Sequence, residues 1–222
     1  MARVGITDDK YRFGSGPAPV LQPGTLGWSA ADLDDPAVRS LWEDGRYEII
    51  EGVLTTLPPL PFRHGNSLSN LQFCLREHFR AVRFRARFAI AVEIEINPRR
   101  VLRADGVVVS AGDLPKFESL GSDTRNRRWE DKLLTLPPTL VIESISPGYE
   151  AHDRVTKREW YAEFGVPHYW IVDGFARTLE CLRLAGDEYS VDAVGQDDEV
   201  VSPASFPGLS LPLRAIWDDA PA

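Results

Sequence analysis

Three residues, Asp105, Glu143 and Lys157, have side chains and local sequences that suit catalysis. Asp105 comes directly before the apolar run 106–109, and Glu143 follows the apolar run 140–142. Lys157 lies in a segment whose pattern predicts a helix. A carboxylate at the end of a buried strand costs free energy unless it is paired or binds a metal. Two such carboxylates and a lysine are the groups that a magnesium-dependent phosphodiesterase needs, because the cation takes oxygen ligands, lowers the pKa of an attacking water and offsets phosphate charge.

Each of the three residues also has a purely structural interpretation. Asp105 suits a turn before a strand, and Lys157 suits an exposed helical ion pair with Asp153, worth only about 0.3–0.5 kcal/mol. Glu143 is harder to explain in this way, because the four preceding residues are apolar or β-branched and predict a buried strand. The catalytic interpretation of Lys157 therefore depends on the other two residues and not on its own spacing.

Three further residues are auxiliary candidates. Glu48 begins a predicted strand and is either an additional acid near the cation or a surface residue. His64 precedes the first long predicted helix, where it contacts a phosphate, caps the helix or faces solvent. Asp153 lies four residues before Lys157 and therefore on the same face of the predicted helix.

The apolar periodicity predicts the elements that must position these residues. A helix begins near Ser29, a hairpin over 47–57 turns at Glu51-Gly52, and Asn66 caps a helix. That helix has an apolar stripe of Leu68, Leu71, Leu75, Phe79 and Val82. A second helix is predicted over 151–164, and a loop with one short helix over 110–138. The further strands are predicted at 88–96, 103–109, 139–145, 168–172, 178–184 and 188–193.

This element order predicts an α/β fold with a mixed central sheet flanked by helices. Residues 1–27 are rich in glycine and proline and are expected to form a flexible N-terminal arm. The remaining residues, 28–222, are long enough for one well-buried core and short for two, so a single domain is expected. Pro203, Pro207 and Pro212 predict an irregular tail.

The composition is that of an ordinary globular protein with a net charge of -8, which argues against a general nucleic-acid coating protein. Neither a signal peptide nor an apolar span of membrane length is indicated, and Cys74 and Cys181 lack metal-ligand spacing, so we expect a cytoplasmic protein with reduced thiols. Three arginine clusters either contact phosphate or reflect a general preference for arginine: Arg83, Arg85 and Arg87; Arg99, Arg100 and Arg103; Arg125, Arg127 and Arg128.

The tract from Tyr47 to Asp173 resembles the Uma-type restriction endonuclease family, a branch of the PD-(D/E)XK nuclease superfamily. The residues that carry the resemblance are the segment 47–52, Asp105, the segment 140–147, Asp153, Lys157, Tyr161 and Gly165. The resemblance implies a restriction-endonuclease-like fold and hydrolysis of DNA phosphodiester bonds with Mg²⁺ or Mn²⁺. It assigns Asp105 and Glu143 as metal ligands, beside a backbone carbonyl and waters.

The sequence departs from the superfamily pattern at three positions. Ala104 replaces the proline before the aspartate, and His168 stands where the branch more often has glutamate. Ile145 occupies the position of the usual lysine, and an isoleucine can neither donate a proton nor orient a water. The resemblance includes relatives in which the lysine has moved to the following helix, and it assigns that role to Lys157.

Two other classes of function remain open from the residues alone. One is a catalytically silent nuclease-fold protein that acts as a DNA-binding or dimerisation module. The other is a metal-free, two-carboxylate hydrolase of a sugar or other small molecule. Ser146 is expected to end the turn after Glu143, because no histidine follows it in an arrangement typical of serine hydrolases. The resemblance and the late strands also predict a homodimer.

Overall fold

The structure is a computed structural model that describes residues 20–59, 61–120 and 133–217. The described chain forms two compact units, which we treat separately. The first contains residues up to 59 together with 93–103, and the second contains residues 61–92 together with those from 104 onward. Most of the predicted N-terminal arm, 1–19, lies outside the described residues, and the boundary at residue 27 stays a prediction.

The first unit contains a short helical segment and a β-hairpin. It comprises the 3-10 helix η1 (Ala30–Asp34), α1 (Pro36–Asp44), β1 (Tyr47–Ile50), β2 (Val53–Thr56), and parts of β3 (Ala86–Asn97) and β4 (Arg100–Ser110). The predicted helix start is present, since the backbone N–H of Ser29 donates to Oδ2 of Asp32 at 2.7 Å. The hairpin turns at Glu51 and Gly52, whose φ angles of 52° and 79° are those that a tight hairpin turn requires.

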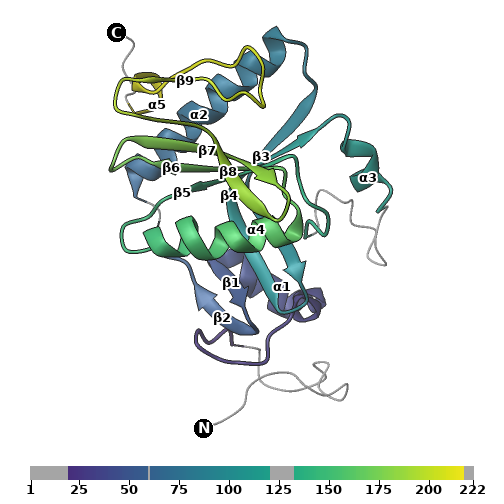
Figure 1. The fold of residues 1–222 in the computed structure, drawn as a ribbon. Helices are drawn as coiled ribbons and strands as arrows, with labels where there is room; N and C mark the ends of the chain where they lie inside the picture. The colour runs from purple at the N-terminus through teal and green to yellow at the C-terminus, as the bar shows by residue number, and fades with distance from the viewer. Residues whose placement is uncertain (1–19, 60, 121–132, 218–222) are drawn as a thin grey trace. The chain divides into compact units, whose positions relative to one another are not determined.

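The second unit holds most of the sheet and the longer helices (Figure 1). Its strands run in the order β4-β5-β6-β7-β8, and β3 also pairs with β4. Strands β5 and β6 are parallel, whereas β4–β5, β6–β7 and β7–β8 are antiparallel, which makes the sheet mixed as predicted. The elements not yet bounded are α2 (Phe62–Ala81), α3 (Leu114–Glu118), β5 (Leu140–Ser144), the π-helical segment η3 (His152–Lys157), α4 (Arg158–Phe164), β6 (His168–Asp173), β7 (Thr178–Ala185), β8 (Glu188–Gln196), β9 (Val200–Val201), β10 (Leu211–Pro212) and α5 (Arg214–Trp217).

Alternation along β5 and β6 assigns the two helical layers to opposite faces of the sheet. One set of alternate residues joins the core beneath α2, and comprises Leu140, Ile142, Trp170 and Val172. The intervening residues must project to the other face. There the ring of Tyr161, on α4, lies 5.3 Å from the ring of Tyr169. Glu143 belongs to this second set, so β5 presents it to the η3–α4 side.

Helix α2 begins five residues earlier than predicted. Pro61 precedes the first helical residue, and Asn66 lies inside the helix, so its expected role as the cap is wrong. Proline lacks an N–H and has a restricted φ, which makes the position after it a natural helix start. The predicted stripe is buried at Leu68, Leu71, Leu75 and Phe79, but Val82 lies beyond the helix and is 51% exposed.

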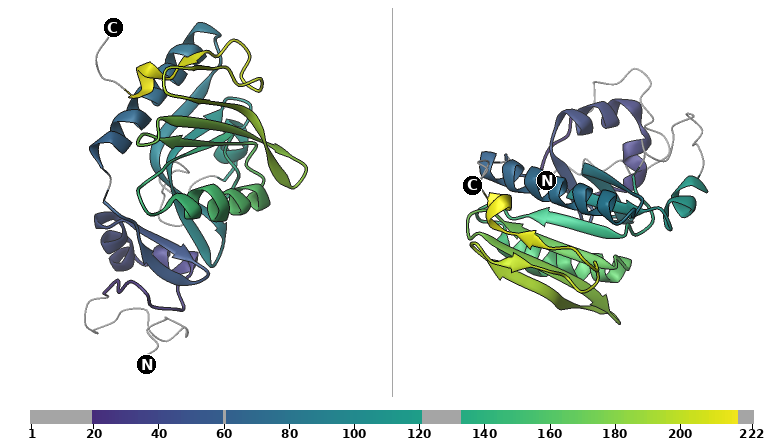
Figure 2. Two further views of the ribbon diagram at one scale, coloured as in Figure 1. Left: turned by 60° about the vertical axis from the view of Figure 1, so that its left-hand side comes forward. Right: turned by 90° about the horizontal axis from the view of Figure 1, so that it is seen from above.

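The C-terminal tail was predicted to be irregular, and this prediction is wrong in one respect. Strands β9 and β10 pair, and α5 returns to α2, where the side-chain amide of Asn70 donates to the carbonyl of Ile216 at 3.2 Å (Figure 2). Seven tail residues enter the core: Val201, Phe206, Leu209, Leu211, Leu213, Ile216 and Trp217. The prolines interrupt regular structure without preventing burial.

Two further findings concern the described chain as a whole. Both cysteines are free, and no described helix is long and apolar enough to cross a membrane.

The packing of the tail predicts a measurable difference between two neighbouring positions. Leu211→Ala should lower the free energy of unfolding by about 2–5 kcal/mol, because Leu211 is fully buried. Val200→Ala, on the paired strand, should change it by less than about 0.5 kcal/mol, because Val200 is 59% exposed. Urea titrations followed by circular dichroism test both variants, and equal effects would contradict the packing of the tail.

Candidate active site

Glu143 is the residue around which the candidate site is built. It lies near the end of β5 and is only 2% exposed. Its Oε1 accepts a hydrogen bond from the Tyr161 hydroxyl at 2.8 Å and another from the Lys157 ammonium at 3.2 Å. Both donors come from the helical segment that follows β5, so the two elements are connected through a single buried oxygen.

Lys157 is buried between two carboxylates. It is 3% exposed, and its Nζ lies 3.7 Å from Oδ1 of Asp153 as well as 3.2 Å from Glu143. The predicted helix over 151–164 is present, but its first part is π-helical over His152–Lys157, which the sequence pattern did not indicate. A π turn is wider than an α turn and is common at functional sites. The structural interpretation of Lys157 as part of an exposed ion pair with Asp153 is therefore wrong, since both residues are buried.

Asp105 reaches the same place from β4. Strands β4 and β5 pair with Gly106 opposite Ile142, and continuing this antiparallel register places Asp105 opposite Glu143. Directly opposed residues project to the same face of a sheet. Consistent with this, Oδ2 of Asp105 accepts a hydrogen bond from the backbone N–H of Ser144 at 2.9 Å. The two acids that the sequence singled out are thus on neighbouring strands and on one face.

His64 extends the cluster from α2. Its Nε2 lies 3.3 Å from Oδ2 of Asp105, within ion-pair distance but without the alignment of a hydrogen bond. Its Nδ1 lies 3.5 Å from the hydroxyl of Ser146. His64 is inside the first turn of α2 and is 2% exposed, so neither a helix cap nor a solvent-exposed role fits it. The contact with Ser146 was not predicted, because His64 precedes it by 82 residues.

Glu48 lies in the other unit, where its side chain is fully buried. Its Oε1 accepts a hydrogen bond from the backbone N–H of Arg103 at 2.9 Å. The alternative interpretation as a surface strand residue is therefore wrong, because that hydrogen bond and the burial give Glu48 a structural role within its own unit. Its part as an auxiliary acid stays a prediction.

The charges of the cluster act on a neighbouring tyrosine. Burial raises the pKa of Tyr169 well above its ordinary value, and the negative charges of Glu143 and Asp153 raise it further. The Tyr169 hydroxyl donates to the backbone carbonyl of Asp153 at 2.9 Å. Tyr169 therefore stays neutral and holds the π-helical segment against the sheet.

The donor set fits a small, hard cation with a partly hydrated shell. Among the described residues, no group of three or more His, Cys, Asp and Glu side chains could hold a metal ion. Asp105 and Glu143 supply two carboxylates on one face, and Asp105 has a side chain that is 14% exposed. Mg²⁺ commonly binds through one or two carboxylates, keeps several waters and completes its shell with substrate phosphate. Two carboxylates without a protein cage are thus compatible with Mg²⁺, and would not suit a structural zinc site.

The fold is shared with a protein of known structure. It is similar to the crystal structure of a "putative nuclease belonging to DUF820" from Anabaena variabilis ATCC 29413, with a TM-score of 0.60 and 18% sequence identity. The match covers 78% of this chain and 90% of that chain. At this identity the similarity establishes the fold alone. The comparison with curated proteins gave no match.

The family follows from the sequence itself. Residues 38–214 match the model of the Uma2 family, whose description is "Putative restriction endonuclease". Since the match spans most of the chain, the protein belongs to the Uma2 family, as the resemblance had predicted. The tract that carried the resemblance, from Tyr47 to Asp173, lies entirely within the matched residues.

The burial of Lys157 predicts a large effect of its removal on stability. Lys157→Met should lower the free energy of unfolding by about 3–5 kcal/mol, because it leaves two buried carboxylates without their cation. Lys116→Met is the matched control, since Lys116 is 69% exposed and pairs with Asp113 at 2.9 Å. That change should cost about 0–1 kcal/mol. Chemical denaturation compares the two, and a loss no greater for Lys157 would rule out a buried ion pair.

Proposed function

We propose that this protein is an endonuclease that hydrolyses phosphodiester bonds in DNA with Mg²⁺ or Mn²⁺. The observation that best supports the proposal is the position of Lys157, whose Nζ lies 3.2 Å from Oε1 of Glu143. A lysine is needed beside the second acid, and the sequence has Ile145 at the usual place. The η3 segment supplies the missing charge from outside the strand. Membership of the Uma2 family and the nuclease fold agree with this chemistry.

In this proposal Asp105 and Glu143 hold the cation. When bound, a divalent ion lowers the pKa of a coordinated water and offsets negative charge on the phosphate. Tyr161 positions Glu143 through the 2.8 Å hydrogen bond to Oε1. The backbone N–H of Ser144 and the ring of His64 position Asp105 through contacts of 2.9 and 3.3 Å to its Oδ2.

Lys157 acts as a charge and a hydrogen-bond donor. An ammonium carries three donor hydrogens, and the contact with Glu143 uses one of them. In the proposal this ammonium orients the attacking water or contacts a phosphate oxygen. Hydrolysis then forms a bond from the water oxygen to phosphorus and breaks the bond from phosphorus to the leaving sugar oxygen. The positive charge beside that phosphate stabilises the additional negative charge of the transition state.

The ion pair also argues against a metal-free glycosidase. Such an enzyme needs one protonated carboxylic acid as a general acid. Glu143 instead accepts hydrogen bonds from an ammonium and a hydroxyl, which stabilise a carboxylate. The silent DNA-binding or dimerisation module remains the rival that an experiment must separate from the nuclease.

Two variants separate the ligand role from the charge role. Glu143→Gln should abolish both Mn²⁺ binding and cleavage, because an amide is a weaker ligand than a carboxylate. Lys157→Gln should slow cleavage by at least about 100-fold, the scale expected for one electrostatic donor, while Mn²⁺ still binds. Calorimetric titration of Mn²⁺ and cleavage of supercoiled plasmid DNA measure the two properties, at a temperature where circular dichroism shows folded protein.

The metal requirement provides the control for these variants. EDTA should stop plasmid cleavage by the unaltered protein, and added Mg²⁺ should restore it. Cleavage that persists at full rate in EDTA, or in Glu143→Gln, would contradict the proposed site. DNA binding without any cleavage in Mg²⁺ or Mn²⁺ would select the silent module.

We also propose that the protein forms a homodimer. Strand β8 is the last strand in the sheet order of its unit, and Val191 and Val194 on it are 64% and 61% exposed. An edge strand with exposed apolar side chains can pair with a second copy. Light scattering at micromolar concentration should give about twice the chain mass of 24.8 kDa, and Val191→Lys should shift the mass toward the monomer. A monomeric mass for the unaltered protein would contradict the dimer.

A further inference from the structure

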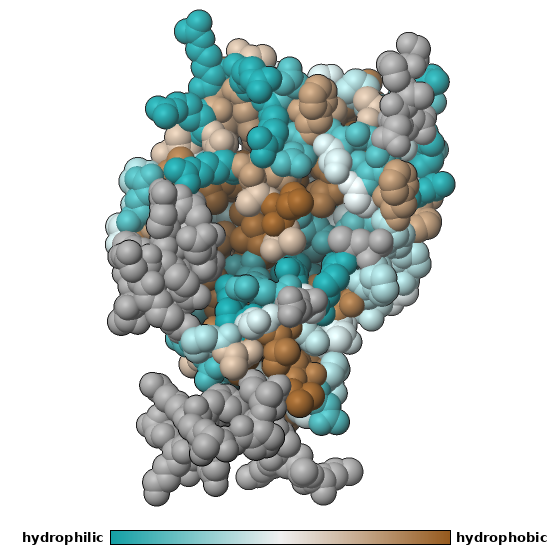
Figure 3. All heavy atoms as spheres, turned by 180° about the vertical axis from the view of Figure 1, so that it is seen from behind, coloured by the Kyte–Doolittle hydropathy of each residue, from teal (hydrophilic) through white to brown (hydrophobic). Residues whose placement is uncertain are grey.

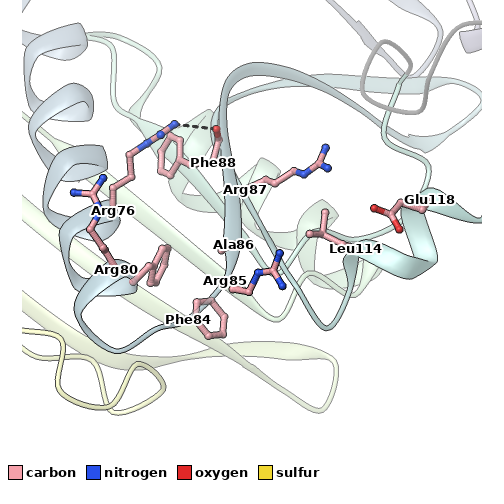
Figure 4. Close-up of a pocket in the computed structure, with 10 residues that line it drawn as sticks. Arg76, Arg80, Phe84, Arg85, Ala86, Arg87, Phe88, Leu114 and Glu118 are labelled. Carbon is pink, nitrogen blue, oxygen red and sulfur yellow. Dashed lines mark hydrogen bonds between the residues drawn. The ribbon is translucent and has the colours of Figure 1, made fainter.

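An arginine-lined groove lies in the second unit, between α2, β3 and α3 (Figure 4). Its volume is about 470 Å³, and no residue of the candidate active site lines it. The lining includes four arginines, two of them on α2, one just before β3 and one on β3: Arg76, Arg80, Arg85 and Arg87. Figure 4 shows Arg85, just before β3, and Arg87, on β3, extending toward α3, which carries Leu114 and Glu118. The groove therefore combines basic groups from two elements.

The charge of this groove is opposite to that of the whole chain. The protein has a net charge of -8, whereas the groove is lined by four arginines and one glutamate, Glu118. An arginine guanidinium presents several donors in a fork that matches phosphate. Among the described residues Arg85 forms no ion pair. A cleft lined by one sign of charge attracts ligands of the opposite charge.

Aromatic rings accompany the arginines. The guanidinium of Arg76 lies 5.9 Å from the centre of the Phe88 ring and donates to the Phe88 carbonyl at 3.3 Å, which fixes its position. Phe84 is 40% exposed and packs against Phe79, with 5.1 Å between the ring centres. Figure 3 shows one face of the molecule, on which hydrophobic side chains reach the surface among hydrophilic ones. Arginines that bind phosphate, interleaved with an exposed ring, are typical of surfaces that bind single-stranded nucleic acid.

The other two arginine clusters do not offer the same surface. In the first unit, Arg99 donates to the carbonyl of Glu51, Arg100 pairs with the Glu51 carboxylate, and Arg103 donates to the carbonyl of Gly45. These contacts give the three arginines a role in stabilising the fold of the first unit. The third cluster, Arg125, Arg127 and Arg128, lies outside the described residues.

We propose that this groove binds single-stranded DNA, with Arg85 and Arg87 on the phosphates and Phe84 stacked on a base. The inference uses the proposed function for the class of substrate, but it requires no cleavage. The groove and the candidate active site have no residue in common. Binding at the groove would hold an unpaired or frayed strand, and so adds a preference for DNA structure that the acidic site by itself cannot provide.

The test measures binding of a fluorescent 12-nucleotide oligo-dT by anisotropy, in EDTA so that cleavage cannot contribute. Replacing both arginines, Arg85→Gln with Arg87→Gln, should weaken binding at least tenfold. It should also lower the slope of log affinity against log salt by about 1.4, since each phosphate contact on a single strand contributes about 0.7. Phe84→Leu keeps an apolar side chain against Phe79 and should weaken binding about fivefold through lost stacking.

The matched control is Arg183→Gln with Arg214→Gln, two exposed arginines of the same unit that do not line the groove. It should leave binding within about twofold. Equal weakening by the control pair, or unchanged binding in the Arg85 and Arg87 variant, would overturn the proposal. So would the absence of oligo-dT binding by the unaltered protein, or equal competition by duplex DNA, RNA or polyglutamate. Binding that survives in Glu143→Gln supports the groove even if no cleavage is found, so failure of one proposal is distinguishable from failure of the other.

Discussion

The buried contact between Lys157 and Glu143 is the constraint on which the candidate site depends. Removing an ammonium and a carboxylate from water costs several kilocalories per mole for each ion, and only close pairing with further hydrogen bonds offsets that cost. Here the Tyr161 hydroxyl donates a further hydrogen bond to Oε1 of Glu143, and Asp153 is a second carboxylate beside Lys157. Two carboxylates and one ammonium leave negative charge in the cluster if all are ionised. A bound cation would offset that charge. The same buried carboxylates would therefore account both for the free-energy cost of burying the cluster and for the proposed metal binding.

This pairing is possible because of the connection between β5 and β6. Parallel strands cannot be joined by a tight turn, and the chain crosses over through a helix that packs on one face of the sheet. The crossover begins directly after Ser144, where the N–H of Ile145 still donates to the carbonyl of Val172 at 2.8 Å. Gly148, with a φ of 87°, then turns the chain before η3. The same crossover that closes the parallel pair therefore brings Lys157 back to the end of β5.

The position of Lys157 shows that a charged group can reach a strand-end carboxylate from a different element of the fold. Ile145 is 2% exposed and contributes to the buried interior, so the strand position has become part of the packing. The positive charge enters from the following helical segment and reaches the same carboxylate. In the proposed function, this segment thus supplies the positive charge that the usual strand position lacks. For this reason, the evidence for function comes from atoms around Glu143 and not from the fold.

Much of the fold was predictable from local pattern. The apolar runs that flank Glu143 and His168 predicted β5 and β6, and Glu51-Gly52 predicted the hairpin turn, since strand burial and tight turns depend on neighbouring residues. The buried side of α2 was likewise visible as a stripe with spacings of three and four. The start of α2 was not, because Asn66 and Pro61 are both local start signals and the periodicity does not choose between them.

The sequence by itself determined that Asp105 and Glu143 each adjoin an apolar run, and that Lys157 shares a helix face with Asp153. The expected position at a strand end holds for Glu143 but is wrong for Asp105, which lies in the middle of β4. Only the tertiary structure decided that Lys157 is buried against Glu143, that its segment is π-helical, and that His64 lies beside Asp105. These contacts depend on strand register and on how a crossover packs, which are set by the sum of many distant interactions. A local pattern contains the chemical groups of a site, whereas their distances come from the packing of the whole unit.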